Sequence, residues 1–239
     1  MDTESIFKFL ETFKNFPTYQ FERRIDAFLL PYLTNAINQR FNLNDPDLVF
    51  VYPEFPLMRL GNVDERSQKL SDSADYLLWS KKLNIVYIVE LKTDIKSIHE
   101  TQFKTYLFNC QKGWEELIKY YISKAIGNRK NWKKFVNGLL YVDLKAPELL
   151  GSVREKDLSK YLNKSQGVHA YLEELKNKIS FSETPKVNFL YIAPNKANTI
   201  LESFLKNSEK AVGFYIGLLS LEEFAKYTED PLKRLLSNI

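Results

Sequence analysis

Two carboxylates and one ammonium stand on segments of the chain that are otherwise fit for burial. Asp75 directly precedes the apolar run at residues 76–79, while Glu90 and Lys92 lie at the end of a second apolar run that begins at Ile85. Both runs are rich in aromatic and β-branched residues, which predicts two strands, and the short polar stretch between them predicts a tight turn. The sequence therefore predicts a β-hairpin that carries three charged groups.

The register of this hairpin decides whether the charged groups meet. If the turn is centred between Lys82 and Leu83, antiparallel pairing places Asp75 opposite Glu90. Directly opposed residues have Cβ atoms about 4.5–5.5 Å apart. Side chains two residues apart share a face, so Lys92 joins the pair. A turn shifted by half a position would send Asp75 to the other face of the hairpin.

The charge balance of such a group points to a metal ion. Two close carboxylates repel each other, and the ammonium of Lys92 relieves only part of that repulsion. Carboxylate and carbonyl oxygens are ligands of Mg²⁺ or Mn²⁺, and no group of cysteines or histidines offers a softer site. The alternative is an ordinary cross-strand salt bridge in which Lys92 extends to solvent from the strand end.

Two helices are expected before the hairpin, over residues 4–16 and 19–40, because apolar residues recur there with helical spacing. Glu22 and Asp26 lie one turn apart beside the apolar stripe of the second helix. They either point toward a site at the edge of the sheet or belong to a solvated helix face, and the second interpretation is favoured for both.

Residues 47–55 predict a strand that forms an antiparallel meander with the hairpin, and Pro53 marks its end or an edge position. The following stretch, residues 56–73, has no clear periodicity, and loops of this length are usually functional or disordered. It leads directly into Asp75, so folding over a bound substrate is one role open to it. Asp72 lies in this stretch but off the expected face of Glu90, which makes it the weaker candidate ligand.

A helix is expected after the hairpin. Ser97 and Glu100 match the capping-box pattern, which predicts a helix that starts at Ser97 and runs on through Tyr121. Gln102 and Tyr106 lie one turn apart on one face of this helix. Both side chains are therefore expected to reach the charged face of the hairpin.

The densest basic segment of the chain covers residues 127–134 and includes Trp132 among its cations. An aromatic ring among cations is the composition that contacts with a nucleic-acid backbone use, and a solvated turn is the alternative. The candidate nucleic-acid-binding residues are Arg129, Lys130, Lys133 and Lys134.

The order of elements predicts an α/β fold with a mixed sheet flanked by helices. Residues 127–180 are mostly helical in pattern and predict a helical insertion. The last third of the chain returns to alternating strands and helices, with strands at 187–193 and 212–218 and helices at 198–205 and 221–227. A single domain over residues 1–239 is expected, with its core at about 19–125 and 185–228.

The composition fits one globular domain: 239 residues, 44% hydrophobic and 27% charged, with a net charge of +4. No apolar run approaches the roughly 20 residues of a membrane helix, and no secretory signal is visible. Cys110 is the only cysteine, which excludes an intramolecular disulfide and favours a small buried side chain in a reducing compartment. A cytoplasmic protein without a membrane partner is expected, and the sequence does not indicate its oligomeric state.

These residues together resemble the PD-(D/E)XK nuclease superfamily. Asp75 followed after fourteen residues by Glu90-Leu91-Lys92 is similar to its signature, although Ala74 replaces the proline of the motif. Gln102 and Tyr106 resemble the Q-x-x-x-Y motif of its exonuclease-type branch. The resemblance covers roughly residues 19–125 and implies a restriction-endonuclease-like core.

The resemblance also implies roles for these residues. Asp75, Glu90 and the main-chain carbonyl of Leu91 would hold Mg²⁺ or Mn²⁺, and Lys92 would orient or help to deprotonate the attacking water. Gln102 would steady Lys92 or the water, while Tyr106 would brace the site or touch a phosphate; Glu22 corresponds loosely to a first-helix acid of some branches. The implied activity is metal-dependent hydrolysis of nucleic acid, with DNA favoured over RNA.

Two other interpretations stay open on the sequence alone. One is a catalytically inactive nuclease-fold module that binds nucleic acid or a protein partner without cutting it. The other is a purely structural or interaction protein. Strand preference, endonuclease or exonuclease mode, and sequence specificity are not indicated.

Overall fold

The structure is a computed structural model that describes residues 22–60, 72–127, 132–153, 168–208, 211, 213–228, 232, 233 and 236. The helix predicted over residues 4–16 lies outside the described residues, as do Arg129 and Lys130 of the basic segment. Glu22 is the first residue of a described helix, but its side chain and those of Asp26 and Asp72 lie outside the description.

The described chain is an α/β structure in which strands and helices follow one another as expected. The strands are β1 (Val49–Leu57), β2 (Asp72–Ser80), β3 (Ile85–Leu91), β4 (Lys186–Ala193) and β5 (Tyr215–Ser220). The α-helices are α2 (Glu22–Arg40), α3 (Glu100–Lys112), α4 (Trp114–Gly127), α5 (Trp132–Lys145), α7 (Val168–Lys178), α8 (Ala197–Lys206) and α9 (Leu221–Phe224). The 3₁₀ turns are η2 (Ile95–Ser97), η3 (Pro147–Leu150) and η5 (Ala225–Tyr227).

The five strands form one mixed sheet in the order β1-β2-β3-β4-β5. Strands β1, β2 and β3 are antiparallel neighbours, whereas β3, β4 and β5 run parallel to one another. The expected mixed sheet flanked by helices is therefore confirmed. Pro53 lies in the edge strand β1, where a residue without an N–H group costs no ladder hydrogen bond on the open side.

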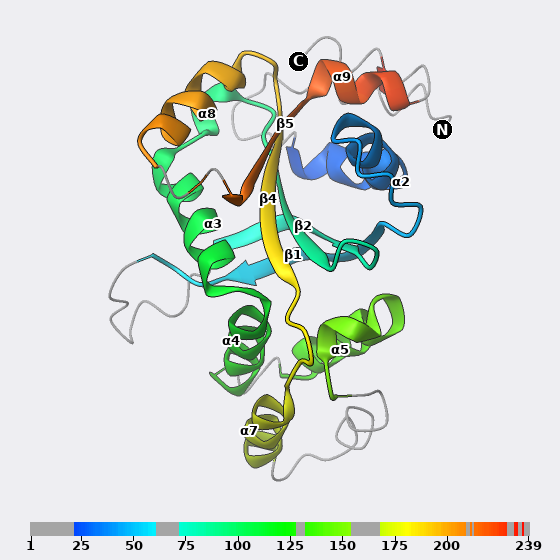
Figure 1. Ribbon diagram of the computed structural model, residues 1–239, viewed down its shortest axis with the longest axis vertical. Coiled ribbons are helices and arrows are strands. Elements are labelled where there is room, and N and C mark those ends of the chain that lie inside the picture. Colours follow the sequence, from blue (N-terminus) through cyan, green and yellow to red (C-terminus); the bar gives the residue numbers. More distant parts are fainter. Residues whose placement is uncertain are drawn as a thin grey trace.

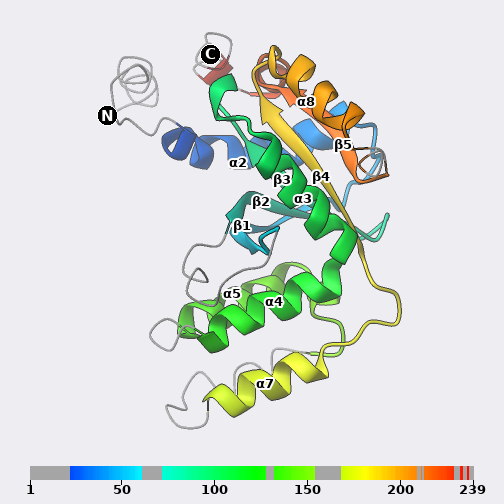
Figure 2. The same ribbon diagram turned by 90° about the vertical axis from the view of Figure 1, so that its left-hand side faces the viewer.

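Both faces of the sheet are covered by helices. Helices α3 and α8 lie on one face and α2 and α9 on the other, and α4, α5 and α7 form a group at one end of the sheet (Figures 1 and 2). Two apolar cores correspond to these layers: one joins the sheet to α3, α4, α5, α7 and α8, and the other joins it to α2 and α9. Among the described helices, none is both long and apolar enough to cross a membrane.

The β2–β3 hairpin has the predicted register. Tyr76 pairs with Val89 and Ser80 with Ile85, so the turn is centred between Lys82 and Leu83. Continuing this pairing by one residue brings Asp75 opposite Glu90. The turn is held in part by Asn84, whose positive φ of 52° closes the connection to β3.

The start of α3 differs from the prediction, because the helix begins at Glu100 and not at Ser97. The side chain of Asp94 accepts a hydrogen bond from the Lys96 backbone N–H and forms the turn η2. Ser97 donates its hydroxyl to the carbonyl of Asp94 at 2.6 Å instead of capping α3. A local side-chain bond before the helix therefore replaces the capping box.

The helix after the hairpin also ends earlier than predicted. Gly113 has φ of 80° and separates α3 from α4, so no single helix continues to Tyr121. The N–H of Gly113 donates to the carbonyls of Asn109 and Cys110, which closes the end of α3. Glycine adopts this left-handed conformation without the steric cost that a Cβ atom would bring.

Three strands differ by a few residues from the sequence pattern, and one of them is β2, which covers Asp72–Ser80 where the apolar run covers residues 76–79. The strand expected at 47–55 is β1 at Val49–Leu57, and the one expected at 212–218 is β5 at Tyr215–Ser220. Phe214 donates its N–H to the carbonyl of Ala211 at 3.0 Å just before β5 begins. Cys110 is buried as expected, and burial raises the pKa of its thiol well above the ordinary value.

A buried carboxylate ties the turn of the hairpin to the loop before β1. Asp45 is 1% exposed, accepts the hydroxyl of Ser80 and accepts the N–H of Asp47 at 3.0 Å. Ser80 in turn accepts the N–H of Leu83 at 3.1 Å, and Asn38 binds the N–H and carbonyl of Asp45. This network fixes the turn on which the hairpin register depends.

Replacing Asp45 by alanine is expected to lower the free energy of unfolding by about 2–4 kcal/mol, because it leaves the Ser80 hydroxyl and the Asp47 N–H without their acceptor. Urea denaturation followed by circular dichroism measures the change. The exposed side chain of Asp47 supplies the control, since Asp47→Ala should stay within about 0.5 kcal/mol of wild type. Equal losses in the two variants would show that the buried network contributes nothing.

Candidate active site

The carboxylate of Glu90 is the centre of a group of polar side chains between β3 and α3. Glu90 is 2% exposed, and its Oε1 lies 2.6 Å from the ammonium Nζ of Lys92. Gln102 donates its amide to the same oxygen at 2.6 Å, and the hydroxyl of Tyr106 donates to Oε2. The amide of Gln102 also donates to the Tyr106 hydroxyl at 3.0 Å. Helix α3 therefore binds the carboxylate through two side chains that are hydrogen-bonded to each other.

Asp75 reaches the same strand end from β2. Its Oδ2 accepts the backbone N–H of Leu91 at 2.7 Å, at the point where the backbone pairing of β2 with β3 stops at Tyr76 and Val89. The carboxylate thus takes the place of the next ladder bond and is held against the residue that follows Glu90. The structure brings together Asp75, Glu90, Lys92, Gln102 and Tyr106, and these residues are called the Glu90 cluster below.

Helix α3 is anchored to the sheet edge by a buried amide. The side chain of Asn109 accepts the N–H of Met58 at 2.9 Å and donates to the carbonyl of Met58 at 2.8 Å. This pair of bonds holds the helix against the end of β1. Since Tyr106 lies one turn before Asn109, the anchor also sets the depth at which the Tyr106 hydroxyl meets Glu90.

The Glu90 cluster is buried at its centre and open at its rim. The side chain of Lys92 is 12% exposed, and Asp75 and Gln102 are half-buried, whereas Glu90 and Tyr106 are almost fully enclosed. Two carboxylates and one ammonium leave one net negative charge there. A net negative charge beside a partly exposed rim attracts small cations.

Burial, and next the charge of Glu90, raise the pKa of Tyr106 well above its ordinary value. The phenol therefore stays protonated at neutral pH and acts as a permanent donor to the carboxylate. Burial likewise raises the pKa of Tyr121 and of Tyr191, the latter a strand β4 residue beside the cluster.

These tyrosines predict a loss of stability at alkaline pH. An unfolded tyrosine loses its proton near a pH of about 10, whereas Tyr106 keeps its proton in the folded chain. Unfolding therefore releases protons above that pH, so the free energy of unfolding falls as the pH rises, by up to about 1.4 kcal/mol per pH unit for each such group. Urea midpoints measured from about pH 8 to about pH 11 test this, and Tyr106→Phe should show a shallower fall. The same slope in both proteins would contradict the assignment to Tyr106.

The oxygen donors of the cluster suit a hard divalent cation. Asp75 and Glu90 supply carboxylates and Leu91 a main-chain carbonyl, and Mg²⁺ is commonly held by one or two carboxylates with its other positions filled by water or phosphate. The described residues contain no group of three or more His, Cys, Asp or Glu placed to hold a metal. Within the described residues, the cluster therefore offers a cation at most two carboxylates and one main-chain carbonyl.

Sequence reasoning missed two residues next to the cluster. Asn109 was not a candidate, because its role depends on the contact between α3 and the end of β1. Tyr191 was not a candidate either, although parallel pairing makes it the cross-strand partner of Glu90. The alternation of residues 187–193 places Phe189 and Tyr191 on one face, but only the strand pairing shows which face that is.

The basic segment does not join the Glu90 cluster in the described residues. Lys133 and Lys134 are exposed on α5, and the ammonium of Lys133 lies 5.7 Å from the centre of the Trp132 ring. Helix α5 packs on α4 and β1, at the end of the molecule away from the N-terminal half of α3 (Figure 1).

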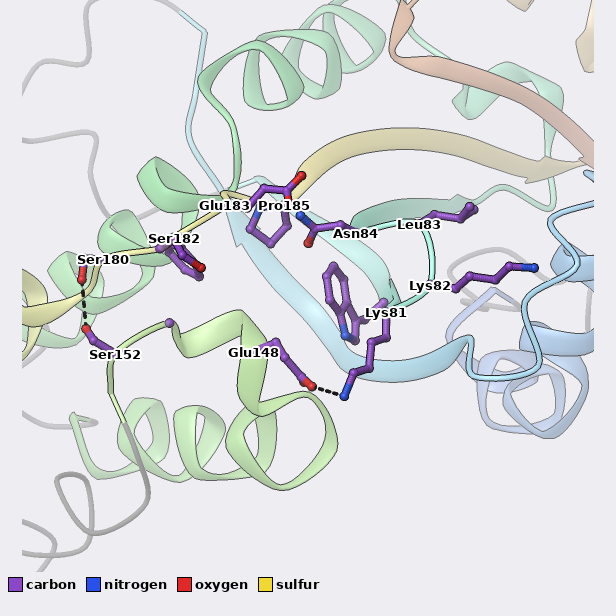
Figure 3. Close-up of a pocket in the computed structure, with 13 residues that line it drawn as sticks. Lys81, Lys82, Leu83, Asn84, Glu148, Ser152, Ser180, Ser182, Glu183 and Pro185 are labelled. Atoms are coloured by element: carbon purple, nitrogen blue, oxygen red, sulfur yellow. Dashed lines mark hydrogen bonds and ion pairs between the residues drawn. The ribbon is translucent and has the colours of Figure 1, made fainter.

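A cavity of about 790 Å³ lies at the opposite end of the hairpin, where Lys81 of the turn points toward Glu148 of η3 (Figure 3). None of the cluster residues lines it. Its polar groups are partly paired among themselves, through the Lys81–Glu148 ion pair at 2.5 Å and the hydrogen bond from Ser180 to Ser152 at 3.3 Å. The concentration of buried charge, and not the size of a cavity, marks the candidate site.

No protein-family model matches the chain, and comparison with curated proteins and with solved structures returned no match. The Glu90 cluster is therefore a candidate site on its geometry alone.

Proposed function

We propose that this protein hydrolyses phosphodiester bonds of nucleic acid at the Glu90 cluster, with a restriction-endonuclease-like core of the PD-(D/E)XK type. The observation that carries the proposal is the convergence on one strand end of an acid from β2, an acid and a lysine at the end of β3, and a Gln–Tyr pair from α3. Donors around a buried carboxylate also suit a structural ion pair, so the feature that favours a cation site is the second acid, Asp75, at the partly open strand end.

Asp75, Glu90 and the carbonyl of Leu91 would hold Mg²⁺ or Mn²⁺. When bound there, such a cation lowers the pKa of a coordinated water and offsets charge on the scissile phosphate. The Lys92 side chain is 12% exposed, and its ammonium would orient the attacking water and stabilise charge that develops on the phosphate oxygens.

Gln102 and Tyr106 keep Glu90 in place while Lys92 acts. Their donors occupy both oxygens of the carboxylate, which fixes its orientation between β3 and α3. Tyr106 is buried and bonded to Glu90, which supports a bracing role over direct contact with a phosphate. No covalent intermediate on the protein is required, because water is the nucleophile.

DNA is the proposed substrate, and the cations of the basic segment are proposed to contact its backbone. Lys133 and Lys134 are exposed on α5 and accompany an aromatic ring, a composition that suits phosphate contacts. Because α5 lies at one end of the sheet, these contacts would belong to a part of the nucleic acid distant from the scissile bond.

A second candidate function is binding of nucleic acid or a protein partner without cleavage. The observation that favours it is the internal neutralisation of Glu90, whose two oxygens already accept three donors from Lys92, Gln102 and Tyr106. In that case the cluster would stabilise the fold and would not bind a cation.

One experiment separates the two functions. The purified full chain is incubated with linear DNA, circular DNA and RNA, each with Mg²⁺, with Mn²⁺ and with a chelator, and Lys92→Ala serves as the inactive control. Metal-dependent cleavage that is absent in the variant supports the nuclease, and cleavage of circular DNA identifies an endonuclease. Nucleic-acid binding without cleavage under all metal conditions would support the binding module instead.

A further inference from the structure

Tyr191 lies directly beside the catalytic carboxylate on the neighbouring strand. It is the parallel cross-strand partner of Glu90, and both side chains lie on the face of the sheet that α3 covers. Its ring is held by aromatic neighbours on that helix: the ring centre of Tyr106 is 5.9 Å away, and Phe103 stacks at 6.4 Å. Position and packing thus place the Tyr191 ring in the interior beside the Glu90 cluster.

The hydroxyl of Tyr191 is fully buried and has no hydrogen-bond partner among the described residues. A buried hydroxyl without a partner costs free energy, so its retention calls for a physical reason. Burial, followed by the charge of Glu90, raises the pKa of Tyr191 well above its ordinary value. The group is therefore a protonated donor that lacks an acceptor.

Glu90 has room for one more donor. Its Oε1 accepts Lys92 and Gln102, and its Oε2 accepts Tyr106, whereas a carboxylate offers about four acceptor positions. The Tyr191 hydroxyl is shielded from solvent, so a substrate phosphate that enters from the rim cannot reach it as it reaches Lys92. Glu90 is the cross-strand partner of Tyr191, and its carboxylate is the charge that acts most strongly on the Tyr191 hydroxyl.

The Lys92 ammonium cannot keep its ion pair with Glu90 and also turn to a substrate phosphate. Its ammonium lies 2.6 Å from Oε1 of Glu90, and a turn toward a phosphate oxygen would remove the charged partner of that carboxylate. We propose that Tyr191 is a positioning residue for Glu90, whose hydroxyl becomes a donor to the carboxylate when Lys92 leaves it for a phosphate oxygen. This inference rests on the proposed function, because that function is the reason for Lys92 to move.

A double-mutant cycle on the metal-free full chain tests the exchange of donors. Tyr191→Phe in the wild-type background removes an unpaired hydroxyl and should leave the thermal midpoint unchanged or slightly raised. In the Lys92→Ala background Glu90 has already lost the ammonium, so Tyr191→Phe should lower the midpoint by about 3–6 °C. Lys92→Met replaces Lys92→Ala if the alanine variant does not fold.

The control for this cycle is Tyr87→Phe, which makes the same change at a buried tyrosine of β3 on the opposite face of the sheet. It should shift the midpoint equally in both backgrounds. If Tyr191→Phe also acts equally in both, the two residues are not coupled through Glu90 and the inference is overturned.

Cleavage kinetics add a second readout that separates this inference from the proposed function. Tyr191→Phe should lower kcat on DNA by about tenfold with KM within about twofold of wild type, because the loss appears only after Lys92 has moved. A wild-type chain that does not cleave overturns the proposed function and this inference with it. A wild-type chain that cleaves, together with unchanged kcat in Tyr191→Phe, overturns this inference alone.

Discussion

Lys92→Ala is expected to lower the rate of metal-dependent DNA cleavage by about 10³-fold or more, since it removes the only ammonium that the described residues place on Glu90. A lysine of this kind acts mainly on the transition state, so kcat should fall while KM for DNA changes little. Single-turnover cleavage with enzyme in excess measures the chemical step directly.

The structure adds an effect of Lys92→Ala on stability that the hairpin alone did not indicate. Glu90 loses its charged partner but keeps Gln102 and Tyr106, so the variant should fold with its free energy of unfolding lowered by about 1–3 kcal/mol. Assays at low temperature keep both proteins folded. The matched control is Lys96→Ala, an exposed lysine on η2, which should be active and stable. Cleavage by Lys92→Ala at the wild-type rate would contradict the proposed nuclease function.

Glu90→Gln is expected to abolish cleavage through the loss of charge with little change of shape. The glutamine side chain can still accept the Gln102 amide and can donate to the Tyr106 hydroxyl, so the contact of α3 with β3 is preserved. Affinity for Mn²⁺, measured by calorimetry, should fall by about 100-fold or more, because one of the proposed anionic oxygen ligands becomes neutral. Cleavage should fall by about 10³-fold in parallel.

The control for Glu90→Gln is Glu100→Gln, which makes the same change at the surface pair that Glu100 forms with Lys104 at 2.8 Å. An exposed pair of this spacing contributes about 0.3–0.5 kcal/mol, so neither cation affinity nor cleavage should change. Wild-type Mn²⁺ affinity in Glu90→Gln would show that the carboxylate is not a ligand. That result would favour the binding module.

The hairpin and its register were predictable because they depend on neighbouring residues. Alternation of side chains in the runs that flank Lys82 and Leu83 and the length of the polar turn were enough to pair Tyr76 with Val89. The spacing of Gln102 and Tyr106 likewise follows from helix geometry alone. Both signals are local, and local periodicity is what a single sequence carries most directly.

The boundaries of α3 were not predicted in the same way. Ahead of the helix, the side chain of Asp94 accepts a backbone N–H, and Ser97 does not cap the helix. At the other end, Gly113 has a positive φ and ends the helix. At the start, the local bonds of Asp94 form a turn in place of the predicted capping box. At the end, Gly113 is itself a sequence signal for a helix end, which the predicted continuation to Tyr121 did not use.

The sequence by itself determined which charged groups share one face of the β2–β3 hairpin and which two side chains α3 offers to it. Only the tertiary structure decided that Gln102 and Tyr106 both bind Glu90 and that Asn109 anchors α3 at Met58. It also placed Tyr191 beside Glu90 through the parallel pairing of β3 with β4. The physical reason is that face and spacing are set by backbone periodicity, whereas contacts between distant segments depend on how the layers pack around a common core.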